Sequence, residues 1–122
     1  MSFREALRAI VDQTPGGLAA VLMGSDGIAV DEYSRRRGEL DLSAVAVEFQ
    51  RVLEQARLVA AGLYGRAASQ PAELVLVTGQ HQLLFRQLDE EYFIVLALDP
   101  AGLLGKARYL VGNTLDSLRA EL

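Results

Sequence analysis

The sequence predicts an α/β sandwich of the α+β class, with the order α-β-β-α-β-β-β-α and a five-stranded antiparallel sheet. Three observations predict it. A helical pattern without Gly or Pro runs from Asp41 to Ala61, between two groups of strand-like runs. The runs from Leu18 to Met23 and from Tyr92 to Leu98 are apolar throughout, which is typical of strands covered on both faces. We therefore expect the long central helix on one face of the sheet and the two terminal helices on the other.

A helix and an apolar strand open the chain. Ser2 and Glu5 have the spacing of a capping box, in which each side chain can accept a hydrogen bond from the backbone N–H of the other residue. The segment TPGG at residues 14–17 is expected to end this helix. The run from Leu18 to Met23 then forms the first strand.

The tetrapeptide GSDG at residues 24–27 separates this strand from the next one. It could hold a phosphate, or it could form only a turn. A phosphate-binding loop leads into a helix N-terminus, whereas apolar strand-like runs flank this segment on both sides. Asp and Gly are also the residues that tight hairpin turns require. We expect a hairpin whose second strand, Ile28 to Tyr33, points Ile28 and Val30 inward.

Three short strands and a helix are expected in the second half of the chain. The strands are Glu73 to Thr78, Gln82 to Leu88 and Tyr92 to Leu98, and the short polar joints between them predict an antiparallel meander. A Pro-Gly turn at residues 100–102 leads into the last helix. No linker, repeat or low-complexity tract is present, so we expect residues 1–122 to form a single domain.

Composition and charge exclude several classes of function. The formal net charge is −4, so the chain lacks the basic footprint of a nucleic-acid-binding protein. It has no cysteine, which excludes disulfides and thiolate catalysis. The N-terminus lacks the apolar core of a signal peptide, and no apolar run approaches the roughly 18 residues of a membrane span. We expect a cytoplasmic protein.

The sequence contains no recognisable catalytic motif. Gly105 and Lys106 do not complete a P-loop because Ala107 follows them, and no GxGxxG occurs. His81 is the only histidine, and no nucleophile-elbow pattern surrounds any serine. We interpret His81 as an exposed turn residue, and we expect no enzyme activity, no catalytic residue, no metal site and no cofactor.

The central helix carries more apolar surface than a small sheet needs. We expect one broad face to cover the sheet, and it is formed by Val45, Phe49, Val52, Leu53, Ala56, Val59, Ala60 and Leu63. A second stripe lies on the opposite face, and it is formed by Ala44, Val47, Arg51, Glu54, Leu58 and Ala61. Apolar groups mixed with opposite charges are more typical of a helix–helix interface than of a wet surface. Isolated exposed apolar residues are the alternative interpretation.

The strand from Glu73 to Thr78 gives a second indication of an interface. It follows a long connection, so we expect it at an edge of the sheet. Its apolar residues are consecutive, namely Leu74, Val75, Leu76 and Val77. A bare apolar edge invites pairing with another chain. The sequence therefore predicts a two-fold dimer in which these strands and the central helices pair.

Three segments together carry a family resemblance. The first is LAAVLMGSDGIAVDEYS at residues 18–34, the second is the helix at residues 41–64, and the third is YFIVLALDPAGLLGKARYLV at residues 92–111. These segments resemble parts of the Roadblock/dynein light chain 7 family, especially its bacterial MglB-like branch. In order, they resemble the family's first hairpin, its central helix, and its last strand with the Pro-Gly turn and the final helix. The likeness covers Ser2 to Leu122 and implies a roadblock/profilin-like fold.

The resemblance also implies a function. Family members have no catalytic centre of their own, pair through their central helices and third strands, and bind small Ras-like GTPases or serve as dimeric platforms. MglB-like homodimers accelerate their GTPase partner without inserting an arginine finger. The resemblance thus implies a homodimeric regulator of a small Ras-like GTPase, and its interface would use the helix stripe and the edge strand described above.

Several alternatives stay open from the sequence alone. The dimer could be a scaffold subunit of a larger complex with no GTPase role, or, remotely, the chain could be a small-molecule sensor of PAS or GAF type. Arg35, Arg36 and Arg37 could supply an arginine finger, although a solvated loop is the preferred interpretation. Gly112 interrupts the last helix, and close approach of the first helix is one explanation.

Overall fold

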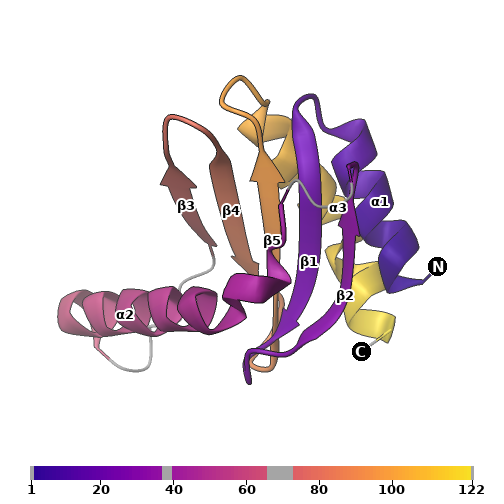
Figure 1. Cartoon of the computed structure of the whole chain (residues 1–122). Helices are drawn as coiled ribbons and strands as arrows, with labels where there is room; N and C mark the ends of the chain where they lie inside the picture. Colours follow the sequence, from indigo (N-terminus) through magenta and orange to yellow (C-terminus); the bar gives the residue numbers. More distant parts are fainter. Residues whose placement is uncertain (1, 37–39, 66–72, 122) are drawn as a thin grey trace.

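The computed structural model describes residues 2–36, 40–65 and 73–121, except the side chains of Ala46, Val47, Leu115, Asp116, Leu118, Arg119 and Glu121. Within these ranges the element order is the predicted one, with a short 3-10 turn before the central helix. Figure 1 shows the sheet with the two terminal helices on one side and the central helix on the other. The predicted α+β sandwich is therefore confirmed.

The first helix, α1 (Phe3–Gln13), begins at the predicted capping residue. The Ser2 hydroxyl oxygen accepts a hydrogen bond from the backbone N–H of Glu5 at 3.1 Å, which satisfies one of the unpaired donors of the first turn. At the other end Thr14 is buried, and its hydroxyl donates to a carbonyl of the last turn at 2.7 Å. The strand β1 (Gly17–Gly24) follows, as expected.

A hairpin turn joins β1 to β2 (Ala29–Ser34), which confirms the turn interpretation of GSDG. The Asp26 carboxylate accepts a hydrogen bond from the N–H of Ile28 at 3.0 Å, and Gly27 adopts a φ of +86°. The expected inward placement of Ile28 and Val30 is wrong, because their side chains are 66% and 41% exposed. The register between the two strands shifts beside the turn, so strict alternation does not hold there.

The sheet contains five antiparallel strands in the order β2-β1-β5-β4-β3. The meander of β3 (Glu73–Val77), β4 (Gln82–Gln87) and β5 (Tyr92–Leu98) is as predicted. The apolar strands β1 and β5 lie inside the sheet and are covered on both faces. This order leaves β2 at one edge and β3 at the other, as expected for β3.

The central helix begins later than the sequence suggests. The Asp41 carboxylate accepts a hydrogen bond from the backbone N–H of Ala44 at 3.1 Å, and it therefore caps the 3-10 turn η1 (Ser43–Val45). The helix α2 (Ala46–Tyr64) starts after that turn. The last helix, α3 (Leu104–Glu121), lies beside α1 on the other face of the sheet.

Two apolar cores hold these layers together. The core between the sheet and the terminal helices is the larger one, and it includes Leu7, Ile10, Leu96 and Val111. The core on the α2 side is formed mostly by the sheet itself, with Phe49 as the buried contribution of α2. The rings of Phe49 and Phe85 pack edge to face, with centroids 5.2 Å apart.

Candidate functional site

The helix α2 is attached to its own chain by very little buried surface. Among its described side chains Phe49 is the only buried one, and Leu53 packs against the core while remaining partly exposed. In the view of Figure 1 the C-terminal half of α2 reaches past β3, beyond the edge of the sheet. A helix in a folded domain is normally stabilised by packing along a whole apolar face. Most of the apolar surface of α2 is therefore available for contact with another chain.

Four apolar side chains form a row along one flank of α2. We call them the flank row, and they are Val45, Val52, Val59 and Leu63. Val45 is the last residue of η1, and the other three lie in α2. These side chains were expected to cover the sheet together with Phe49 and Leu53. Phe49 and Leu53 do pack on it, but for the flank row the expectation is wrong within the single chain. Their exposed fraction rises from 43% at Val45 to 69% at Leu63. At 3.6 residues per turn the flank row lies roughly 40–80° around the helix from Phe49. Because Phe49 docks on the sheet, the flank row is turned out of the core.

The stripe predicted on the opposite face of α2 also lies at the surface. Leu58 is 57% exposed, and Arg51 and Glu54 are exposed beside it. Ala44 is exposed in η1, Ala61 is partly buried, and the side chain of Val47 lies outside the described part of the chain. We refer to Arg51, Glu54 and Leu58 as the outer row.

The charges of the outer row are paired within α2. Arg51 lies 3.6 Å from Glu48, and Arg57 lies 3.3 Å from Glu54. Across a two-fold axis, Arg51 and Glu54 could also meet their counterparts in a second copy. Within the chain each already has an oppositely charged neighbour one helical turn away. In the outer row, Leu58 is therefore surrounded by charged side chains that are paired with opposite charges on the same helix.

The edge strand β3 continues the apolar surface of α2. Leu76 and Val77 are 49% and 67% exposed, and Leu74 and Val75 are partly buried. Leu74 packs against the core on the α2 side, and Leu76 lies on the same face because side chains alternate along a strand. Val75 and Val77 alternate to the opposite face, where Val75 packs against the core of the terminal helices. The flank row and Leu76 are thus exposed apolar side chains on the same side of the sheet.

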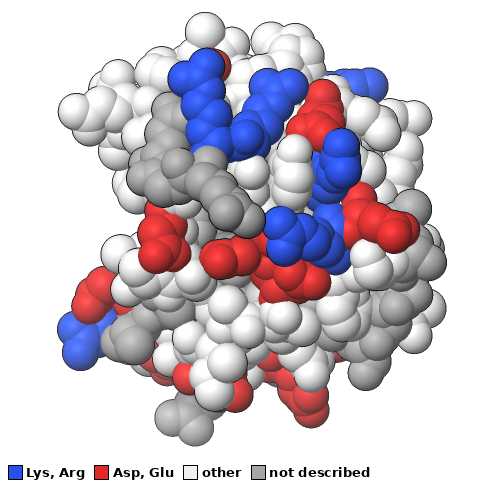
Figure 2. All heavy atoms as spheres, turned by 45° about the vertical axis from the view of Figure 1, so that its right-hand side comes forward, with Lys and Arg blue, Asp and Glu red and all other residues white. Residues whose placement is uncertain are grey.

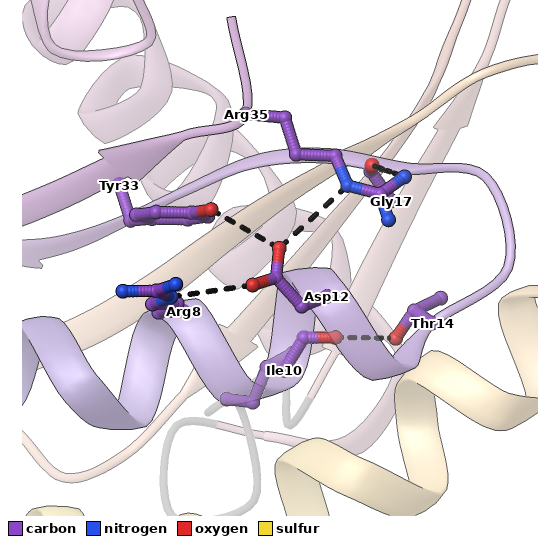
Figure 3. A network of polar contacts seen from close by, with 7 residues as sticks. All are labelled: Arg8, Ile10, Asp12, Thr14, Gly17, Tyr33 and Arg35. Carbon is purple, nitrogen blue, oxygen red and sulfur yellow. Dashed lines mark hydrogen bonds and ion pairs between the residues drawn. The ribbon is translucent and has the colours of Figure 1, made fainter.

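Arg35, from the predicted arginine cluster, is held within the fold (Figure 3). Its Nε atom lies 3.6 Å from the Asp12 carboxylate, and its guanidinium donates to the Gly17 carbonyl at 3.3 Å. The same carboxylate accepts a hydrogen bond from the Tyr33 hydroxyl at 3.1 Å and lies 3.4 Å from Arg8. Arg35 therefore ties the end of β2 to α1 and β1.

Two more arginines belong to this cluster, Arg36 and Arg37. Arg36 is exposed and makes contacts of its own, and Arg37 lies outside the described residues. Arg35 and Arg36 line an open hollow of about 640 Å³ together with His81 and Asp99. His81 is partly buried beside the β3–β4 turn, rather than fully exposed as we expected.

The described residues contain no group of three or more His, Cys, Asp or Glu side chains that could hold a metal ion. Over the same part of the chain, no helix is long and apolar enough to cross a membrane. Figure 2, which turns the β2 and α1 side forward, shows basic and acidic side chains next to one another. This face therefore has no uniformly basic patch of the kind that binds nucleic acid.

Comparison with known proteins places this surface in context. No profile of a protein family matches the sequence, and no curated protein matches it. Among solved structures, MglC from Myxococcus xanthus is 37% identical, with each chain covered over 100% of its length and a TM-score of 0.68. The gliding protein MglB from Thermus thermophilus is 19% identical, with 93% of this chain and 83% of that chain covered and a TM-score of 0.81.

A Roadblock/LC7 domain from Streptomyces avermitilis shares the fold as well. The two chains are 14% identical, the match covers 99% of this chain and 98% of that domain, and the TM-score is 0.77. The likenesses to this domain and to MglB show a common fold, and the identity to MglC extends over the whole length of both chains. The chain belongs to the Roadblock/LC7 family, as its three resembling segments predict.

Proposed function

We propose that this chain is a non-enzymatic homodimeric regulator that binds a small Ras-like GTPase and modulates its nucleotide cycle. The dimer forms through α2 and β3, and the paired helices form the platform that the GTPase contacts. Because the similar structures include MglC and a gliding protein, MglB, we expect the GTPase to belong to a gliding system.

The observation that carries this proposal is the continuous apolar surface of α2 and β3. The flank row and Leu76 are all more than two-fifths exposed, and Leu76 lies on the face of the β3 edge strand that is on the α2 side of the sheet. Scattered exposed apolar residues are normal on a protein surface, but a continuous apolar surface beside an unpaired strand edge is a feature of interfaces.

A second copy related by a two-fold axis fits both parts of this surface. Antiparallel pairing of two β3 edges joins two sheets into one, with an axis perpendicular to the sheet. Both α2 helices then lie on the same face of the joined sheet. Each α2 helix projects past the β3 edge of its own chain. In the dimer this part of the helix lies over the sheet of the other copy, and the flank row becomes buried there.

A regulator that works by contact needs no catalytic group of its own. Arg35, one of the two described arginines of the cluster considered as a catalytic finger, is bound to Asp12 and Gly17. Any effect on GTP hydrolysis would then come from repositioning groups of the GTPase itself. Activation without an arginine from this chain is therefore the expected mode.

The direct test combines molar mass with nucleotide hydrolysis. We expect the purified chain to have the mass of two copies by light scattering, and to form a complex with the small Ras-like GTPase encoded nearest to its gene. Single-turnover GTP hydrolysis by that GTPase should change on addition of the dimer, and should not change on addition of the heat-unfolded chain. A stable monomer would contradict the dimer. A dimer that leaves every small Ras-like GTPase of the genome unbound and unaffected would indicate a scaffold instead.

A further inference from the structure

An open hollow lies at the end of the sheet where two hairpin turns meet. The backbone N–H of Ser25, in the β1–β2 turn, donates a hydrogen bond to the carbonyl of Glu91, in the β4–β5 turn, at 2.7 Å. Both turns lie at the lower end of the sheet in Figure 1. The hollow has a volume of about 330 Å³ and is lined by Gly24, Ser25, Asp26, Ile28, Val30, Glu91 and Tyr92. The contacts of the proposed dimer on α2 and β3 do not use these residues.

The apolar part of the hollow is formed by residues that the core leaves exposed. Ile28 and Val30 are both at the surface, and the register shift between β1 and β2 makes Val30 the extra residue of a bulge. Tyr92 is partly buried against the core of the terminal helices and also lines the hollow. The hollow therefore opens on the side of the sheet that faces away from α2.

The polar part of the hollow carries negative charge. The Asp26 carboxylate accepts one hydrogen bond, from the N–H of Ile28 at 3.0 Å, and has capacity for further donors. The Glu91 side chain is exposed. Neither carboxylate forms an ion pair with any described residue, and the residues that line the hollow include no Lys or Arg. Two uncompensated negative charges thus lie beside exposed aliphatic surface.

We propose that this hollow binds an arginine side chain on an exposed segment of another protein. The aliphatic stem lies on Ile28 and Val30, because long basic side chains bury their methylene groups on apolar surface while their charged ends keep polar partners. The guanidinium donates to the carboxylates of Asp26 and Glu91. Arginine fits better than lysine, because its planar group offers several N–H donors and stacks on aromatic rings such as that of Tyr92.

This contact goes beyond the proposed function and does not depend on the dimer. The strands β2 and β3 lie at opposite edges of the sheet, separated by four strand spacings of about 4.8 Å each. Pairing through β3 therefore leaves the hollow accessible on each copy. The hydrogen bond between the two turns also holds the lining residues in place before a partner arrives, which lowers the entropy cost of binding.

A matched pair of peptides tests the charge of the occupant. The probe is a blocked synthetic peptide with one central arginine among alanine and glycine residues, and its twin carries citrulline, which is neutral and nearly the same shape. Binding is followed by the amide chemical shifts of the isotope-labelled chain. We expect saturable shifts confined to residues 24–31 and 90–93 with the arginine peptide. We expect the citrulline peptide to bind about tenfold or more weakly.

Variants of the chain test the residues of the hollow. Asp26→Asn keeps the side-chain oxygen that accepts the Ile28 N–H, so the turn is preserved while the charge is removed. We expect Asp26→Asn, Glu91→Gln and Ile28→Ser each to bind the arginine peptide about fivefold or more weakly. Glu32→Gln is the matched control, because Glu32 is an exposed residue of β2 that does not line the hollow. It should bind the peptide as the unmodified chain does.

Three results would overturn the assignment. Equal binding of the two peptides would show that charge is not recognised. An equal loss in Glu32→Gln and Asp26→Asn would indicate general attraction to an acidic chain. Unchanged binding by Ile28→Ser would remove the apolar part of the site. We expect Val59→Asp, which places a charge in the flank row, to give monomer by light scattering and to bind the arginine peptide as tightly as the unmodified chain. Failure of the hollow therefore leaves the proposed function standing, and failure of the dimer leaves the hollow.

Discussion

The carboxylate of Asp31 accepts a hydrogen bond from the backbone N–H of Glu32, at 2.8 Å, on the strand that forms one edge of the sheet. The Asp31 side chain thereby satisfies one backbone N–H group of β2. Two neighbouring acidic residues and an irregular register with β1 further distinguish this edge. The other edge, β3, has a regular register with β4 and four consecutive apolar residues. Charges and bulges are the devices that keep edge strands from pairing, and β2 has both. The described length of β3 has no bulge, and its one charge, Glu73 at the first position, is paired with Arg86 and Arg108.

This asymmetry predicts that a lysine is tolerated at one edge and not at the other. Leu76 and Val30 are similarly exposed, at 49% and 41%, and they lie on opposite edges of the sheet. We expect Leu76→Lys to give monomer by light scattering, because its charge would be buried against a second copy. Val30→Lys should leave the mass unchanged. A monomeric Val30→Lys variant beside a dimeric Leu76→Lys variant would mean that β2, and not β3, is the pairing edge.

The weak attachment of α2 leads to a prediction about its folding. The second half of the helix has no buried side chain, and isolated helices of fewer than about 12–15 residues are marginal in water. We expect the amides of residues 57–64 to lose protection from hydrogen exchange when the dimer is dissociated by Val59→Asp. The amides of β5, which is buried on both faces, should stay protected in the same variant. Equal protection of residues 57–64 in dimer and monomer would show that α2 does not need the second copy.

Local signals allowed much of the fold to be predicted from the sequence. The cap at Ser2, the Asp26–Gly27 turn and the strand Tyr92–Leu98 depend on residues close together in the chain, and the structure has all three where they were expected. The edge position of β3 also followed from its long preceding connection. These features need no knowledge of the packing between distant elements.

The buried face of α2 could be predicted only in part: Phe49 and Leu53 pack on the sheet as expected, but the face is narrower than expected. Apolar residues occur around more than half of this helix, so periodicity alone does not select the buried face. The choice is made by Phe49, which packs on the ring of Phe85 in a strand 36 positions further along the chain. That contact turns Val52 and Val59 outward, and it changes which residues the candidate interface contains. The placement of Ile28 was missed for a related reason, because the register shift depends on β1.

The position of Arg35 predicts that its loss weakens the fold rather than regulation. Arg35→Ala removes the ion pair with Asp12 and the hydrogen bond to Gly17. Because the side chain is 46% exposed, we expect a loss of about 1 kcal/mol or less in the free energy of unfolding. The effect of the dimer on GTP hydrolysis should remain. Asp12→Asn is the matched variant, since it removes the same charge pair while retaining Arg35. If Arg35→Ala abolished the effect on hydrolysis and Asp12→Asn did not, an arginine finger would be indicated.

Gly112 in the middle of α3 leads to a prediction about stability. Close approach of α1 was one explanation for this glycine, but a Cβ added there would meet no atom within 4 Å. An interior helical glycine is less favourable than alanine by about 1 kcal/mol. We therefore expect Gly112→Ala to raise the free energy of unfolding by up to about that amount, measured by urea denaturation. Gly102→Ala is the control, because its Cβ would lie 2.8 Å from the Cβ of Leu98, and we expect it to destabilise the fold. A Gly112→Ala variant that is less stable as a dimer but not as a monomer would instead indicate that a second chain approaches α3 closely at this position.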